Sequence, residues 1–197
     1  MKKTIIILVT LYSQIIFCQE IISSKTYINT CYQGQQCFSF SNGSYLFFNR
    51  GNNEFDIVLD FGKFKIGSDT LDRWLEDLDD TKLFFKGYLN TANLLELTHH
   101  NSKAITVNGK ITFNNITISH SIELTLFEIA GNGILYRDNG HDYFDRVNAN
   151  LQFAFLPKEF KINKKANHLK KSISIAVYRG YVNEFKPGME SWLQIKN

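Results

Sequence analysis

The feature that most constrains this chain is a long alternation of apolar and polar residues at positions 115–127, NITISHSIELTLF. A period of two over this length predicts a β-strand with one apolar face and one polar face. The apolar face could contact only the protein's own side chains, or it could line a cavity that holds an apolar guest. The apolar parity comprises Ile116, Ile118, His120, Ile122, Leu124 and Leu126, and the polar parity comprises Thr117, Ser119, Ser121, Glu123 and Thr125.

Period-two runs separated by turn residues occupy most of the remaining sequence. Residues 37–49, CFSFSNGSYLFFN, place Asn42-Gly43 between two aromatic-rich arms, which predicts a β-hairpin. In residues 53–66, Glu54, Asp56 and Asp60 share the polar parity. Roughly eight or nine strands are predicted in all, and their even spacing favours an antiparallel barrel or a sandwich. The other runs are residues 82–90, 104–113, 133–138, 146–155 and 172–182.

One segment has the helical period instead. Within SDTLDRWLEDLDD, residues 68–80, apolar residues recur at Leu71, Trp74, Leu75 and Leu78. This spacing predicts a single short amphipathic helix near residues 69–79, capped by Ser68 or Asp69. Its carboxylates lack the glycine-bearing loop and the ligand spacing of a calcium site, so we expect a solvated helix face.

The N-terminus has the pattern of a secretory signal. Lys2 and Lys3 precede an apolar stretch at residues 4–17, which is too short to span a bilayer comfortably. We therefore expect residues 1–19 to be a signal peptide and residues 20–197 to form one domain, periplasmic or secreted after cleavage. Lipidation at Cys18 is disfavoured because bulky Phe17 precedes it.

Charge and motifs argue against several classes of function. Removal of Lys2 and Lys3 takes the formal net charge from +3 to +1, so we expect no nucleic-acid partner. The sequence contains no Gly-x-Ser-x-Gly elbow, no glycine-rich phosphate loop and no Cys-x-x-Cys pair. Its histidines lack metal-ligand spacing. We expect no enzyme activity, no catalytic residue, no metal site and no cofactor.

Two cysteines are placed to form a local disulfide. Cys31 and Cys37 flank a short segment that contains Gly34, and an oxidising compartment would let them bond. Closing so short a loop should contribute only about 2 kcal/mol. Free thiols are the alternative.

The order of these motifs resembles the YceI-like family of exported proteins. The resemblance covers residues 36–183 and is carried by Phe85-Lys86-Gly87-Tyr88-Leu89, by Gly109-Lys110-Ile111-Thr112-Phe113 with Asn115-Ile116-Thr117, and by Phe160-Lys161-Ile162. The proline that the family shows after its helix is missing here, and the segment with the two cysteines has no counterpart. The resemblance implies a lipocalin-like antiparallel barrel that encloses a long apolar chain such as a polyisoprenoid and is capped by the helix.

The leading prediction is an exported, non-enzymatic protein that holds an isoprenoid or another long apolar lipid in its barrel. The 17 Phe and 9 Tyr residues could supply large apolar walls. The alternative is a structural or interaction module whose barrel is filled by its own aromatic side chains. We expect no membrane-spanning segment in the mature protein, and homodimer formation is left open. The predicted apolar lining is Phe85, Ile111, Phe113, Ile118, His120, Ile122, Leu124 and Phe153, with His120 either a core residue bonded to a neighbouring oxygen or a contact for a ligand head group.

Overall fold

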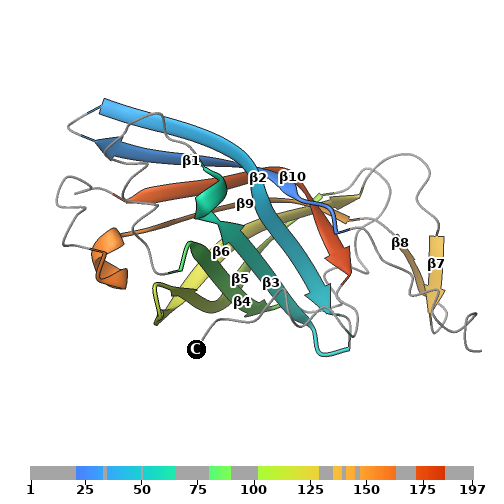
Figure 1. The fold of residues 1–197 in the computed structure, drawn as a ribbon. Coiled ribbons are helices and arrows are strands. Elements are labelled where there is room, and N and C mark those ends of the chain that lie inside the picture. Colours follow the sequence, from blue (N-terminus) through green and yellow to red (C-terminus); the bar gives the residue numbers. More distant parts are fainter. Residues whose placement is uncertain are drawn as a thin grey trace, which may run out of the picture.

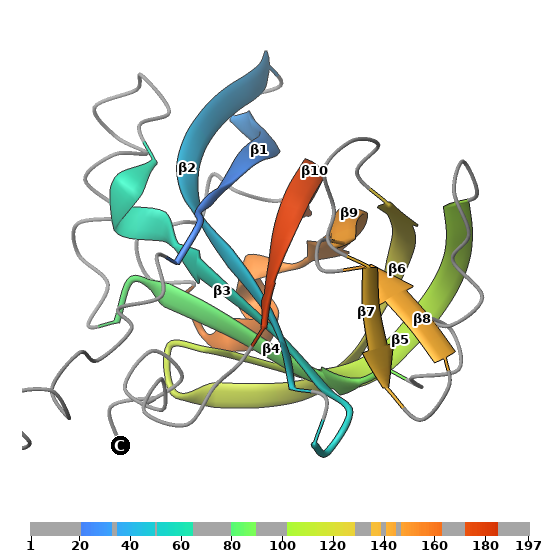
Figure 2. The same cartoon turned by 90° about the vertical axis from the view of Figure 1, so that its right-hand side faces the viewer.

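The structure is a computed structural model that describes residues 21–32, 35–49, 51–64, 80–89, 102–128, 135–138, 141–144, 147–162 and 172–184. It is mainly β, and eight strands form one sheet that closes on itself (Figures 1 and 2). The predicted lipocalin-like barrel of about eight strands is confirmed. The predicted helix near residues 69–79 lies outside the described residues.

The barrel strands are β1 (Ser24–Tyr32), β2 (Gln35–Asn49), β3 (Glu54–Asp60), β4 (Lys82–Tyr88), β5 (Ser102–Phe113), β6 (Ile116–Glu128), β9 (Val147–Phe155) and β10 (Ile173–Glu184). Two short strands, β7 (Leu135–Asp138) and β8 (His141–Phe144), form a separate antiparallel pair. Two 3₁₀ turns, η1 (Phe61–Lys63) and η2 (Pro157–Phe160), follow β3 and β9. Among the described residues, no helix has the length and hydropathy needed to cross a bilayer.

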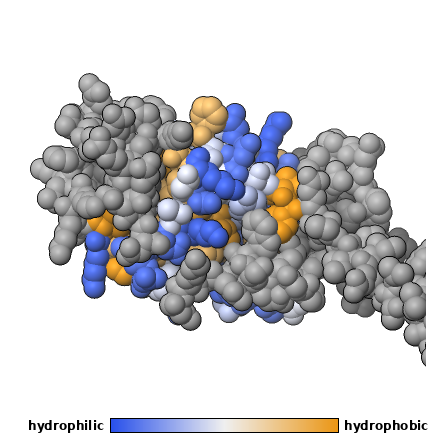
Figure 3. Space-filling view, in the orientation of Figure 1, coloured by the Kyte–Doolittle hydropathy of each residue, from blue (hydrophilic) through white to orange (hydrophobic). Residues whose placement is uncertain are grey.

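The alternating strand of the sequence is β6, and its parity prediction is confirmed. β6 pairs along its whole apolar stretch with β5. The two strands are joined by Asn114 and Asn115, whose φ angles of 48° and 59° suit a tight two-residue hairpin turn. The apolar parity faces the barrel interior, where Ile122 and Leu126 have no exposed surface. The polar parity faces outward, and polar side chains cover much of the described surface in Figure 3.

The predicted hairpin at Asn42-Gly43 is wrong, because β2 runs through both residues as one strand. Residues 35–44 of β2 pair with β1, and residues 44–49 pair with β3. The β1–β2 register shifts between Ser24 and Thr26, opposite Asn42-Gly43, so the pair forms a β-bulge that bends the strand between two partners. Gly43 is also confined, since a Cβ there would lie 3.0 Å from the Asp60 carbonyl oxygen.

The barrel closes where β1, β2 and β10 meet. β1 lies between β2 and one end of β10, and past it β10 pairs directly with β2 in parallel, at residues 182–184 and 46–48. This parallel contact departs from the antiparallel pattern of the other ladders. Buried Asn183 secures it, because its Nδ2 donates to the carbonyls of Leu46 and Ile22, both at 3.0 Å, and its Oδ1 accepts from the Ile22 amide at 2.9 Å.

One end of the barrel is filled by four buried phenylalanines, Phe61, Phe113, Phe155 and Phe160, here called the phenylalanine plug. The rings of Phe61 and Phe113 stack with centroids 5.1 Å apart, and those of Phe155 and Phe160 meet edge to face at 5.3 Å. Such geometries add to the stabilisation that aromatic burial gives. The plug joins η1, β5, β9 and η2, so it holds the two 3₁₀ turns against the sheet.

Candidate functional site

The eight side chains predicted to line the barrel do share its inner wall. Phe85, Ile111, Phe113, Ile122, Leu124 and Phe153 belong to one buried apolar cluster, and Ile118 packs against it. His120 joins them through an edge-to-face contact with Phe153, with ring centroids 6.0 Å apart. Their role as the lining of a ligand site stays a prediction.

Phe85 has a seat made by two glycines. Gly87 of β4 pairs with Gly109 of β5, and Gly109 pairs with His120 of β6, so the three residues form a row across the inner wall. A Cβ at Gly87 would lie 2.8 Å from the Phe85 ring, and one at Gly109 would lie 2.7 Å from it. Only hydrogen fits at both positions, so the ring lies flat on the sheet. This explains the glycines of the two motifs that carried the family resemblance.

The inner wall is unequally closed along β6. The β6–β9 ladder runs from Glu128–Val147 to Glu123–Gln152 and ends there, while β9 continues with β10 as far as Phe155. Inward side chains of the paired half are almost fully buried, with Leu124 at 1 % exposed. In the other half Ile116, Ile118 and His120 are only partly buried, whereas Ile122, next to the end of the ladder, has no exposed surface.

We call this unpaired stretch, residues 116–122 of β6 facing residues 153–155 of β9, the β6–β9 seam. It is bounded at one end by the ladder. At the other end the side-chain nitrogen Nδ2 of Asn114 donates a hydrogen bond to the Phe160 carbonyl at 3.0 Å, which connects the β5–β6 turn to η2. Apolar side chains that belong to the interior are therefore reached by solvent along a limited stretch of the barrel wall.

The interior beyond the seam is closely packed. Phe55, Ile57, Leu83, Ile111 and Ile175 come from different strands, and each has no exposed surface. A void wide enough for water would expose the side chains around it, so these five contact protein atoms on all sides. At this depth a guest chain could enter only if side chains moved.

The predicted lining omitted three members of the plug, Phe61, Phe155 and Phe160. Phe61 continues the apolar parity of β3, and Phe155 ends the period-two run of residues 146–155, so the pattern marked both. Phe160 lies in η2, which has no such pattern. In the described segments no three His, Cys, Asp or Glu side chains converge as metal ligands would. The backbone register pairs Cys31 with Gln36 and Cys37 with Thr30, and the side chains of both cysteines lie outside the described part, so their disulfide stays a prediction.

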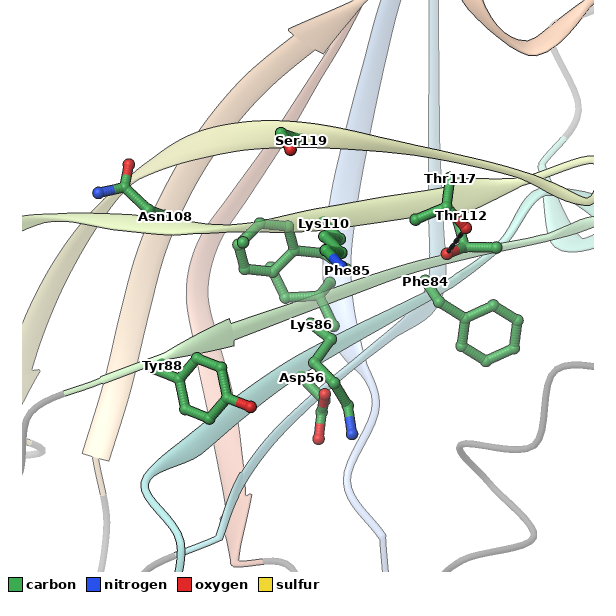
Figure 4. Close-up of a pocket in the computed structure, with 12 residues that line it drawn as sticks. Asp56, Phe84, Phe85, Lys86, Tyr88, Asn108, Lys110, Thr112, Thr117 and Ser119 are labelled. Carbon is green, nitrogen blue, oxygen red and sulfur yellow. Dashed lines mark hydrogen bonds between the residues drawn. The ribbon is translucent and has the colours of Figure 1, made fainter.

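A second concave site lies on the outer face of β3, β4, β5 and β6. It is a pocket of about 460 Å³ with mostly apolar walls. Figure 4 shows Asp56, Lys86 and Tyr88 pointing to the same side of β4, with Phe84 farther along the strand. Its lining is Asp56, Ile57, Phe84, Phe85, Lys86, Tyr88, Asn108, Gly109, Lys110, Thr112, Thr117 and Ser119.

Asp56 is the unusual group of this outer pocket. Its outward position agrees with the polar parity of its strand, yet it is only 3 % exposed. Burial raises the pKa of its carboxyl from 3.8 to about 6; nearby Lys86 opposes this rise and nearby Glu54 adds to it. No sequence signal distinguishes this carboxylate from those of Glu54 and Asp60, which share its parity and are only partly buried.

Comparison with known proteins places the fold. No protein-family model matches the sequence, and no curated protein matches it significantly. A polyisoprenoid-binding domain from Saccharophagus degradans, implicated in plant cell wall breakdown, superposes with a TM-score of 0.60 at 8 % identity, over 79 % of this chain and 90 % of that one. BcnA of Burkholderia cenocepacia superposes with a TM-score of 0.52 at 11 % identity, over 78 % of this chain and 93 % of that one. The protein has a YceI-like fold.

A Campylobacter jejuni YCEI protein is a more distant match, with a TM-score of 0.43 at 11 % identity over 70 % of this chain and 79 % of that chain. The two matches with TM-scores above 0.5 confirm the YceI-like fold predicted from the order of the sequence motifs. At identities of 8–11 % the likeness concerns the fold alone.

Proposed function

We propose that this YceI-like protein binds an isoprenoid or another long apolar lipid inside its barrel, without catalysing a reaction. The observation that carries the proposal is the β6–β9 seam, where Ile116, Ile118 and His120 face inward but are only partly buried. An apolar chain inserted there would cover side chains that solvent now reaches. Each Å² of apolar surface removed from water contributes roughly 25 cal/mol, so a long chain needs few polar contacts.

The described fold supports this proposal in two further ways. The Saccharophagus degradans domain with the same fold is named for polyisoprenoid binding. The inner wall around the seam also carries aromatic side chains, including Phe153 beside His120. In the proposal the imidazole lies where the polar head of a lipid would meet the barrel wall.

A second candidate function is favoured by the packing of the interior. Because side chains such as Ile111 and Phe85 are already enclosed by protein, the barrel could be a self-filled module that acts through its surface. The two candidates differ in what a lipid must displace. A lipid binder needs core side chains near the seam that can move apart, whereas a self-filled module needs none.

Mass spectrometry of the intact protein, purified from its own cells without denaturant, separates the two functions. We expect a copurified mass that organic solvent extracts, and we expect the stripped protein to take up a fluorescent polyprenyl probe. A short-chain analogue with the same fluorophore and head group is the matched control. If the stripped protein takes up neither probe and no lipid copurifies, the self-filled module becomes the better account.

We also propose that the protein acts after export, in the periplasm or outside the cell. The support is the signal-like pattern of residues 1–19. Cell fractionation with an antibody against the barrel, together with sequencing of the mature N-terminus, tests this. Recovery of the uncleaved chain in the cytoplasm would contradict it.

A further inference from the structure

We propose that the pocket on the outer face of β3–β6 binds a small organic ammonium compound, whose charged group pairs with Asp56 and whose apolar body lies against Phe84 and Tyr88. This outer site does not depend on lipid binding inside the barrel. It is separated from the interior by the sheet itself, because Asp56 and Tyr88 occupy the outward parity of their strands.

The carboxylate of Asp56 is buried without a partner. More than nine-tenths of the residue is removed from solvent, no hydrogen bond or ion pair joins its side chain to another described residue, and its oxygens keep a small contact with solvent at the pocket. Lys86 lies directly opposite in the β3–β4 ladder, but its ammonium is 3.2 Å from Glu54 Oε1. A buried, unpaired charge is costly, and an ammonium group offers three donors that would satisfy it.

The walls of the pocket suit an apolar body attached to that ammonium group. Phe84 is buried at one side, and the ring of Tyr88 is 65 % exposed at the other. At about 460 Å³ the space falls within the range of small-molecule sites. Aromatic faces also attract organic cations, so Tyr88 can contribute both apolar contact and a cation–π interaction.

The charged groups around the pocket favour a cation over an anion at its base. Lys86 of β4 and Lys110 of β5 extend from exposed positions, where solvent and salt screen their charges. Glu54 of β3 neutralises Lys86. β3 pairs with β2 along its other edge, and there the residue opposite Asp56 is Phe47, which carries no charge. An anionic ligand that entered this space would meet the Asp56 carboxylate at its deepest point.

The test is a titration of the purified protein at pH 7.5 with three phenyl compounds of similar size, followed by calorimetry or ligand-observed NMR. We expect 2-phenylethylamine to bind, and 2-phenylethanol and 3-phenylpropionate to bind at least tenfold more weakly. The amine's affinity should also fall as the pH is lowered through about 6, because Asp56 then takes up a proton. The proposal is overturned if the amine fails to bind at millimolar concentration or if the alcohol or the acid binds equally well.

Three variants locate the binding. Asp56→Asn should weaken amine binding at least tenfold, and Tyr88→Ala, which changes an exposed ring, should weaken it severalfold without unfolding the protein. Glu123→Gln is the matched control, since this carboxylate lies on the outer face of β6 outside the pocket and is exposed. Thermal melts of all three confirm folding. Unchanged amine affinity in both pocket variants would overturn the proposal.

Discussion

Asp56 lies directly opposite Lys86 in the β3–β4 ladder, yet the Lys86 ammonium pairs with Glu54 at 3.2 Å. The carboxyl of Asp56 is left buried, and its pKa is raised to about 6. A raised carboxyl pKa means that the folded state holds the proton more tightly than the unfolded chain does. Below the unfolded value of 3.8 both states are protonated and stability is unaffected. As the pH rises from there through about 6, ionisation increasingly opposes folding.

Asp56→Asn should therefore stabilise the protein in a pH-dependent way. The full penalty at pH 8 is on the order of 3 kcal/mol, from a shift of about two pKa units. Urea unfolding at pH 8 should show a gain that shrinks towards zero at pH 4. Glu123→Gln changes an exposed carboxylate, so it should leave the urea midpoints at pH 8 and at pH 4 unchanged. An equal gain at the two pH values would contradict the burial of an ionised Asp56.

Gly109→Ala should destabilise the barrel strongly. The new Cβ would lie 2.7 Å from the Phe85 ring and closer still to the Lys86 carbonyl, so the seat of Phe85 is lost. Overpacking of this kind costs roughly 1–3 kcal/mol, or more where backbone must move. Chemical denaturation measures the loss. Gly51→Ala is the control, because its Cβ would approach only the Asn49 side chain, at 3.2 Å; a similar loss there would mean that the seat is unimportant.

Asn183→Ala should loosen the closure of the barrel. It removes three hydrogen bonds to Ile22 and Leu46, and leaves the Leu46 carbonyl without this donor in a buried place. We expect a loss of about 2 kcal/mol or more, with faster amide exchange at the paired ends of β2 and β10. Asn52→Ala, which removes one exposed hydrogen bond to the Glu54 amide, should cost far less. Equal costs would argue against a closing role for Asn183.

Tryptophan at two positions of β6 should act differently. Ile118 is partly buried at the seam, so Ile118→Trp should keep a melt near that of the parent and block uptake of the polyprenyl probe. Ile122 has no exposed surface, so Ile122→Trp should lower the unfolding free energy by roughly 1–3 kcal/mol. Ser121→Trp, on the outer face of β6, should neither block uptake of the probe nor lower the unfolding free energy. Normal uptake by folded Ile118→Trp would exclude the seam as the route of entry.

The cysteine prediction is tested on protein recovered after export. If Cys31 and Cys37 are bonded, neither thiol should react with a blocking reagent before reduction. Reduction should then lower the melting temperature only slightly, because so short a loop contributes about 2 kcal/mol. Two freely reactive thiols in the exported protein would show that the alternative, a reduced pair, is correct.

Some features of this fold follow from the local residue pattern, and others follow only from tertiary pairing. The sequence by itself determined the strand faces, as the inward Ile122 and Leu124 and the outward Ser121 and Glu123 of β6 illustrate. Side-chain parity is a property of the extended backbone, so it can be predicted without knowing what the strand contacts. The order of motifs likewise sufficed for the barrel fold.

Tertiary structure alone decided the rest. Asn42-Gly43 has strong turn propensity, but pairing with β1 on one side and β3 on the other holds it in a continuous strand. The seam exists because the β6–β9 ladder ends at Glu123–Gln152, whereas β9 stays paired with β10 along its other edge as far as Phe155. Asp56 shares its strand and parity with Glu54, and only the packing around it makes its carboxylate buried and unpaired. Parity specifies which way a side chain points, whereas burial depends on what the folded chain brings to cover it.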